Sequence, residues 1–428
     1  MKHPRGKLSL TSRVLAAIVV GTLLGIVGGD QPYWGGLQNA SLGQLGLLII
    51  RFIKGLAIPL IFFAVVNTLV RTRLSKTVGL RFITICLLNS SIAAVLGLSI
   101  LNLLGSQPEL QSGPREVFNK ILGAQSPSSL QSAGKSGINL LEGIANLLPP
   151  NFIDPLQNNN VIAIVVLAIL VGSAIRSLNA QGEGEESQTA KALEQLAHGG
   201  FLVFSRALQI SLEIVPFAVL GLVAHAVGKA GVQIFVDLGS FLLIAILGLA
   251  SQALLYYPAA AFLITGRNPF EFLRNSGEAM VMAAGVNSSL ATVPVTLKCL
   301  QRMKVGEQAA FISVCGGSNF NNDGIVLYEI MAAIFIAEVL GMHLDLAQQG
   351  VIVISSILAA IGIAGVPEAG LIILPIVLSS TGFPETVIAA AIPLVAPIDW
   401  LVGRCRSAVN VLGDILGACL LDRWNQKS

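Results

Sequence analysis

The stretch IDWLVGRCRSAVNVLGD (residues 398–414) places charged and amide side chains inside an apolar run of about 386–421. At 100° per residue, its polar positions and one glycine share a narrow stripe of a helix. The stripe consists of Asp399, Gly403, Arg406, Asn410 and Asp414. Arg406 has a planar guanidinium suited to a carboxylate, and Asn410 and Asp414 offer oxygens to a cation. The stripe therefore indicates a binding site, although an Arg–Asp pair that only joins two helices would have the same spacing.

The composition is typical of a protein with several membrane spans. The 428 residues are 54% hydrophobic and 11% charged, whereas a soluble domain carries about 25% charged residues. The net charge of +3 reflects 26 basic and 23 acidic residues, a balance that disfavours binding to nucleic acid. The sequence contains no His-Glu-x-x-His or Gly-x-Ser-x-Gly motif, which are the signatures of zinc proteases and serine hydrolases. We therefore expect a membrane protein that is not an enzyme and uses no cofactor.

Six stretches before residue 265 approach the roughly 20 apolar residues that cross a bilayer. They lie at about 14–30, 44–70, 79–105, 159–177, 200–228 and 233–264. The N-terminus and the loop at 71–81 are rich in Lys and Arg, which collect on the cytoplasmic side of a membrane. We therefore expect an uncleaved first helix and both termini in the cytoplasm. Residues of about 106–158 then form an extracellular loop, and those of about 178–198 a cytoplasmic one.

Two later apolar stretches are broken near their middle. The first, about 270–303, is interrupted at 287–294, and the second, about 348–382, at 363–370. Each half is mostly too short to cross a membrane, so the pattern predicts two re-entrant helical hairpins, with two ordinary kinked helices as the alternative. Pro294 and Pro367 are each expected to open the second half, where a missing N–H costs nothing. The exposed N–H groups and positive ends of these half-helices then face an anion.

Between the two hairpins, the residues 316–324 (GGSNFNNDG) combine small and amide side chains around one carboxylate. Such a segment does not propagate a helix well, but it presents several oxygens to a small hard cation. A solvated loop also tolerates this composition. Because the segment runs directly into the apolar residues 325–340, a carboxylate at membrane depth is the favoured interpretation, and such groups are functional candidates.

Several motifs resemble the dicarboxylate/amino acid:cation symporter family, which includes the glutamate transporters. They are residues 52–62, 291–299, 398–400, 404–406 and 410–414. The resemblance implies an all-α membrane protein with eight transmembrane helices, two re-entrant hairpins, inverted repeats, an elevator-like motion and a homotrimer in the plasma (inner) membrane. Residues 1–264 then hold six helices, comprising the scaffold and parts of the transport domain. The remainder, 265–428, is the transport core: hairpin 1 (about 270–303), helix 7 (about 305–341), hairpin 2 (about 348–382) and helix 8 (about 386–424).

The resemblance also implies roles for individual residues. Those that match substrate contacts are Ser288, Ser289, Ala364, Gly365, Val366, Gly403, Arg406, Ser407 and Asn410. Those that match sodium sites are Asn89, Ser90, Gly317, Asn321, Asn322, Asp323, Asn410 and Asp414. Glu329 matches a glutamate that carries the co-transported proton. The expected partners are a small anionic substrate, Na⁺ with or without H⁺ as co-transported ions, and membrane lipid.

Four positions depart from the family pattern. Ile325 replaces a threonine, Cys86 a tyrosine of the third span, and Glu368 a glycine or glutamine. Gly403 replaces the aspartate that pairs with the substrate ammonium, and loss of such a partner costs about 2–5 kcal/mol. We therefore expect the protein to import a C4-dicarboxylate rather than an amino acid. The alternatives are a glutamate or aspartate symporter, an anion channel lined by arginines, and a transport-inactive sensor.

Overall fold

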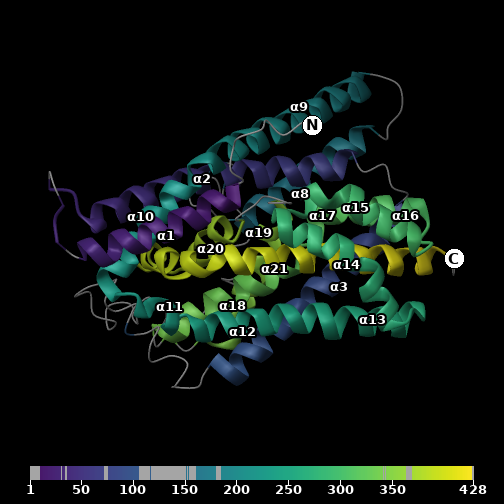
Figure 1. Cartoon of the computed structure of the whole chain (residues 1–428). Helices are drawn as coiled ribbons and strands as arrows, with labels where there is room; N and C mark the ends of the chain where they lie inside the picture. The colour runs from purple at the N-terminus through teal and green to yellow at the C-terminus, as the bar shows by residue number, and fades with distance from the viewer. Residues whose placement is uncertain are drawn as a thin grey trace, which may run out of the picture.

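The computed structural model describes residues 10–29, 31–33, 36–71, 76–105, 116, 151, 153, 161–179, 185–340, 342, 344–362 and 369–426. All regular structure in these ranges is helical, and they contain no strand. Figure 1 shows long helices running roughly alongside one another, with the C-terminal helix α21 (Glu385–Gln426) through the middle of the molecule. Helix α21 contains the polar stripe identified in the sequence, so the segments packed around α21 decide what the stripe can bind.

The first layer of helices comes from the N-terminal half of the chain. It consists of α1 (Leu10–Gly28), α2 (Asn39–Arg71), α8 (Val161–Asn179), α9 (Glu185–Ser211) and α10 (Val215–Ala230). A 3₁₀ turn, η3 (Leu212–Ile214), joins α9 and α10. Helix α2 contacts α8, α9 and α10, and α10 in turn contacts α1. Gly221 allows α2 and α10 to approach closely, because a Cβ there would lie 2.1 Å from the Leu42 carbonyl oxygen. Small residues permit such close packing in membrane helices.

Further helices from this half pack against the C-terminal core. They are α3 (Lys76–Ile100), α11 (Gln233–Asp237), α12 (Gly239–Ser251) and α13 (Tyr257–Thr265). Helix α3 ends in a π-helical turn, η2 (Leu101–Gly105), and a second one, η4 (Gln252–Tyr256), joins α12 to α13. Such turns insert an extra residue into a helix and often mark functional sites.

Broken helices surround α21. In chain order they are α14 (Pro269–Val286), α15 (Ser289–Arg302), α16 (Glu307–Phe311), α17 (Gly317–Phe320), α18 (Asp323–Val339), α19 (Leu346–Gly362) and α20 (Ala369–Ser380). A third π-helical turn, η5 (Ile312–Gly316), joins α16 to α17. Helices α14 and α15 contact each other, as do α19 and α20. Contacts from α14, α15, α18 and α20 enclose α21.

The prediction that a proline opens the second half of a hairpin is wrong for the first hairpin. Helix α15 begins at Ser289, and Pro294 lies inside it. The boundary is set instead by Asn287, which ends α14 in the left-handed conformation (φ 50°, ψ 45°), and by Ser288, whose Oγ accepts a hydrogen bond from the Ala291 N–H at 3.3 Å. Asn tolerates the left-handed region and Ser is a strong N-cap, so these two residues form the turn. Pro367 lies outside the described residues.

The outer surface of the helices is apolar. Within the described part of the chain, four helices are long and apolar enough to cross a membrane: Asn39–Val70, Thr77–Leu104, Glu185–Ala230 and Gln233–Thr265. Large side chains such as Val27 (84% exposed) and Leu263 (77% exposed) point outward. Exposed apolar surface of this extent marks contact with lipid or with another protein.

The contact between α2 and α10 yields a prediction about stability. We expect Gly221→Ala to destabilise the protein by about 1–3 kcal/mol, because the added methyl group overpacks the interface. Gly239→Ala is the control, since a Cβ at Gly239 would meet no atom within 4 Å. The measurement is the thermal unfolding midpoint in detergent, which should fall by several degrees for Gly221→Ala only. Equal midpoints for the two variants would contradict the close packing.

Candidate transport site

The polar stripe of α21 lies in the interior of the protein. Asp399 is 0% exposed, Arg406 2%, Asn410 4% and Asp414 2%. Arg406, Asn410 and Asp414 meet polar groups from other segments, whereas Asp399 pairs with Arg406 on the same helix. The buried charged side chains of the described residues are four carboxyl groups, from Asp323, Glu329, Asp399 and Asp414, and one guanidinium, from Arg406. Because buried charges are costly unless compensated, this excess of acidic groups is the dominant electrostatic feature of the interior.

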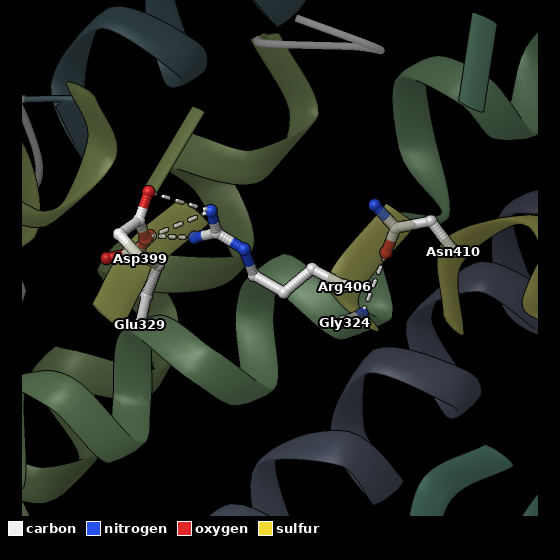
Figure 2. Close-up of polar contacts among 5 residues, drawn as sticks. All are labelled: Gly324, Glu329, Asp399, Arg406 and Asn410. Carbon is white, nitrogen blue, oxygen red and sulfur yellow. Dashed lines mark hydrogen bonds and ion pairs between the residues drawn. The ribbon is translucent and has the colours of Figure 1, made fainter. Parts of the chain in front are cut away.

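The guanidinium of Arg406 is held by two acidic side chains (Figure 2) and packs against an aromatic ring. Its Nη2 lies 3.1 Å from Oδ1 of Asp399, and its Nη1 lies 3.6 Å from Oε1 of Glu329. The guanidinium carbon also lies 4.5 Å from the centre of the Tyr328 ring, a cation–π arrangement. A substrate carboxylate at Arg406 would therefore join or displace two existing carboxyl partners.

Gly370 lets the guanidinium lie directly against the backbone of α20. A Cβ at this glycine would lie only 1.8 Å from Nη1 of Arg406. Any larger residue would push the guanidinium away, so the first turn of α20 depends on glycine for this contact. Arg406 thereby links the second hairpin to α21.

A pocket opens beside Arg406, between the tip of the first hairpin and α21. Its walls are Asn287, Ser289, Ile325, Ala369, Gly403, Arg406, Ser407 and Asn410. The Ser407 hydroxyl donates a hydrogen bond of 3.0 Å to Oδ1 of Asn287, which ties α21 to the hairpin turn. The N-terminus of α15 adds backbone N–H groups and a positive dipole end near Ser289. The wall thus combines one cation with hydroxyls and amides, an arrangement that suits an anion.

Gly403 leaves space in this wall. A Cβ at this position would lie 3.1 Å from Nη2 of Arg406 and 3.3 Å from Nδ2 of Asn287. A carboxylate built at residue 403 would thus project into the pocket. The glycine leaves that place without an acidic group.

Asn410 connects the pocket to the break between α17 and α18. Its Oδ1 accepts a hydrogen bond of 2.8 Å from the Gly324 N–H, as Figure 2 shows. Its Nδ2 donates to Oδ1 of Asn322 at 3.3 Å, and Nδ2 of Asn322 donates to the Ala360 carbonyl at 2.9 Å. Helix ends leave N–H and carbonyl groups without intrahelical partners. These amides satisfy such groups at the start of α18 and near the end of α19.

A second polar cluster lies around Asp323, at the start of α18. The Ser90 hydroxyl donates to its Oδ1 and the Tyr257 hydroxyl to its Oδ2, both at 2.9 Å. Nδ2 of Asn89 donates to Oδ1 of Asn321 at 3.3 Å. We call Asn89, Ser90, Tyr256, Tyr257, Asn321 and Asp323 the Asp323 cluster. Carboxylate, amide and hydroxyl oxygens of this kind suit a small hard cation.

Asp414 lies next to this cluster. Nδ2 of Asn321 lies 3.5 Å from its Oδ1, and a Cβ at Gly317 would lie 2.3 Å from the same oxygen. Asn321 therefore contacts both groups of residues that the sequence assigned to sodium. Among the described residues, no three His, Cys, Asp or Glu side chains gather in one place, so any cation here needs amide, hydroxyl or carbonyl ligands as well.

Most of the residues proposed from the sequence come together in these two places. Ser289, Gly403, Arg406, Ser407 and Asn410 line the pocket, and Ser288 caps the adjoining helix. Of the sodium candidates, Ser90 contacts Asp323, and Asn321 contacts Asn89 and Asp414. Asn322 and Asn410 bond to each other instead, and Glu329 lies beside Arg406. Ala364, Gly365 and Val366 lie outside the described residues.

The sequence analysis did not assign several residues that contact the site. Asp399 lies on the polar stripe and Asn287 in the hairpin break, so the sequence contained a signal for both. It contained no signal for three tyrosines, Tyr256, Tyr257 and Tyr328. Tyrosine is common in apolar helices, and only the tertiary structure brings its hydroxyl or ring to a charge.

The geometry agrees with what comparison with known proteins finds. Residues 10–424 match the sequence profile of the sodium:dicarboxylate symporter family. The chain belongs to this family. Its members are secondary transporters, so the protein is a cation-coupled symporter for dicarboxylates or acidic amino acids, and not an enzyme.

Similar proteins from animals include three excitatory amino acid transporters. Excitatory amino acid transporter 3 of Mus musculus is 26% identical over 457 residues, which cover 96% of this chain and 85% of that protein. Excitatory amino acid transporter 1 of Ambystoma tigrinum is 33% identical over 274 residues, with coverage of 62% and 48%. Excitatory amino acid transporter 4 of Mus musculus is 39% identical over 192 residues, with coverage of 45% and 34%.

The buried Arg406–Asp399 pair predicts that the stability of this symporter depends on the charge of Asp399. We expect Asp399→Asn to destabilise the protein by about 3–5 kcal/mol, because it removes one carboxylate from a buried charge pair. Glu307→Gln is the control, since Glu307 is exposed at the start of α16. Thermal unfolding in detergent measures the effect. If the two variants unfold at the same temperature, Asp399 does not hold Arg406.

Proposed function

We propose that this symporter imports a C4-dicarboxylate, such as succinate, fumarate or malate, together with Na⁺. The observation that carries the choice of substrate is Gly403. An α-ammonium group needs an acidic partner in a buried pocket, and the described residues of the pocket wall contain none. Asp399 and Glu329, the two carboxyl groups that contact Arg406, are paired with its guanidinium.

The pocket offers partners for both ends of a dicarboxylate. Arg406 provides the planar donor fork for one carboxylate. Ser289, Ser407 and Asn410 supply hydroxyl and amide groups for the other, and the N-terminus of α15 adds backbone donors. Ile325 lines the space between them with an apolar wall that suits the methylene or vinyl carbons of such a substrate. In the amino-acid carriers that the sequence resembles, this position is a threonine.

The excess of buried carboxyl groups supplies the reason for coupling to cations. The described interior holds four buried carboxyl groups and one buried guanidinium, so a dianion would add to a surplus of negative charge. In our proposal, cations bind first near Asp323 and Asp414, with Asn89, Ser90, Gly317, Asn321, Asn322 and Asn410 as further sodium-site residues. Glu329 is the candidate carrier of a co-transported proton. Only the empty or the fully loaded site then crosses the membrane.

The same proposal includes an architecture. Eight spans and two re-entrant hairpins, α14–α15 and α19–α20, would form a homotrimer in the plasma (inner) membrane with both termini in the cytoplasm. Residues 265–428 with parts of the preceding half would move as a transport domain. Ala364, Gly365 and Val366 would gate the site from outside. The contacts of α14, α15, α18 and α20 with α21 support one common core.

The contacts of Arg404, the other arginine near the pocket end of α21, give little support to an anion channel. Nη1 of Arg404 donates to the carbonyl oxygens of Ala284 and Gly285 at 2.6 and 2.9 Å. The side chain therefore caps the C-terminal end of α14, which favours a cation. This role in the hairpin turn accounts for Arg404 without a pore.

Uptake into proteoliposomes tests the proposed substrate and ions. With sodium and pH gradients imposed separately, we expect a sodium gradient to drive accumulation of labelled succinate against its own gradient. The apparent affinity for labelled aspartate should be at least about tenfold lower than that for succinate, because the pocket lacks an acidic partner for the ammonium group. A clear preference for aspartate would contradict the argument from Gly403. Passive equilibration without accumulation would indicate a channel.

Gly403→Asp should reverse this preference. The new carboxylate would project toward Arg406 and Asn287 and supply a partner for an ammonium group. We expect the ratio of aspartate to succinate affinity to rise about tenfold or more, since one charge pair contributes about 2 kcal/mol or more. Gly403→Asn has the same shape without the charge and is the matched control. Equal ratios for the two variants would show that charge at residue 403 does not select the substrate.

A further inference from the structure

Two phenol hydroxyls enter the Asp323 cluster from a helix that contributes nothing to the substrate pocket. Tyr257, the first residue of α13, is 0% exposed and donates a hydrogen bond of 2.9 Å to Oδ2 of Asp323. Its neighbour Tyr256 donates a hydrogen bond of 2.6 Å to Oδ1 of Asn89. The sequence signals for cation binding lay on α3, α17, α18 and α21 and in the break between α17 and α18, so α13 is an additional contributor.

The π-helical turn explains how two consecutive residues reach one cluster. Consecutive residues of an α-helix point about 100° apart, so they do not usually share one target. Here the turn Gln252–Tyr256 ends just before Tyr257, and Pro258 follows within the first turn of α13. Because proline has no N–H to donate, the regular hydrogen-bond pattern is interrupted at this place. The local distortion directs both tyrosines toward α3 and α18.

Two further features point to a ligand at this place. Gln252 begins the same π-helical turn, is 0% exposed, and directs its side-chain amide to the Tyr257 hydroxyl. Buried amides are normally hydrogen-bonded. On the opposite side, Gly413 of α21 keeps the space open. A Cβ there would lie 2.8 Å from the Tyr257 hydroxyl oxygen and 3.2 Å from Oδ2 of Asp323.

We propose that Tyr257 is a cation-binding residue of the Asp323 cluster and that Tyr256 is a positioning residue, which orients the Asn89 amide. The ligand is a small monovalent hard cation, Na⁺ in the proposed function on which this inference rests. A phenol can donate its proton to Asp323 and still offer an oxygen lone pair to the ion. The third helix has Cys86 one turn before Asn89 and Ser90, and a thiol is a poor ligand for Na⁺. Helix α13 thus supplies the phenol oxygen that α3 lacks.

The test is sodium titration of the 428-residue protein and of its Tyr257→Phe and Tyr256→Phe variants. One readout is the sodium concentration for half-maximal succinate uptake in proteoliposomes. The second is the rise in thermal unfolding temperature that NaCl produces over choline chloride in detergent without substrate. We expect Tyr257→Phe to raise the half-maximal sodium concentration about tenfold or more, as loss of a hydrogen-bonded ligand oxygen implies, and to weaken the sodium-induced stabilisation. Maximal uptake at saturating sodium should change less.

Tyr33→Phe is the matched control. Tyr33 lies between α1 and α2, and its hydroxyl donates to the Leu24 carbonyl at 3.0 Å, so this variant also loses a partly buried hydroxyl. Its sodium dependence should equal that of the unmodified protein. If Tyr257→Phe does not fold, Tyr256→Phe carries the test, with an expected increase of about threefold.

The possible results separate this inference from the proposed function. If the unmodified protein responds to sodium and both variants respond equally well, the tyrosines do not serve the site and the inference is overturned. If the unmodified protein shows no sodium response in either readout, sodium coupling and this inference both fail. A shift in Tyr257→Phe with none in Tyr33→Phe supports the assignment.

Discussion

Burial of one guanidinium among several carboxyl groups is the constraint on which the interior depends. Arg406 contacts Asp399 and Glu329 from two helices, while Asp323 and Asp414 lie further along the same interior with hydroxyl and amide partners. The protein keeps these charges inside an apolar shell, where unpaired charges are costly. Hydrogen bonds offset part of this cost in the structure. In the proposed function, the co-transported ions offset the rest, which would couple the anion to cations.

Interrupted helices are the means by which the backbone enters the site. A continuous helix satisfies its own N–H and carbonyl groups, so it has little to offer a ligand. The breaks at Asn287–Ser288 and at Asn321–Asn322 release such groups near the centre of the protein. Glycines have a complementary role, because Gly317, Gly370 and Gly413 leave room for polar atoms to approach helix backbones. Irregular backbone and small residues therefore act together.

The pocket beside Arg406 and the Asp323 cluster are physically connected. Asn410 lines the pocket and accepts a hydrogen bond from the Gly324 N–H, next to Asp323. Through Asn322 the same amide reaches Ala360, near the end of the first arm of the second hairpin. A change at any of these points alters the partners of the others. Such a shared network gives a structural basis for a coupling free energy between two binding sites.

The sequence by itself determined the apolar helices, the two breaks, the polar stripe of the last helix and the family. These features are local: hydropathy, turn residues and spacing along one helix are visible in a single segment. It also placed Arg406, Asn410, Asp414 and Asp323 among the candidates. The boundary within the first break was predicted wrongly, because Asn287 and Ser288 set it rather than Pro294.

Only the tertiary structure decided which helices supply the partners. That Arg406 is held by Glu329, that Asn322 reaches Ala360, and that Tyr256 and Tyr257 enter the Asp323 cluster are contacts between segments far apart in the chain. Periodicity assigns a residue to a face of its own helix, but it does not say which helix packs against that face. Where side chains from α3, α13, α18 and α21 meet is therefore a property of packing.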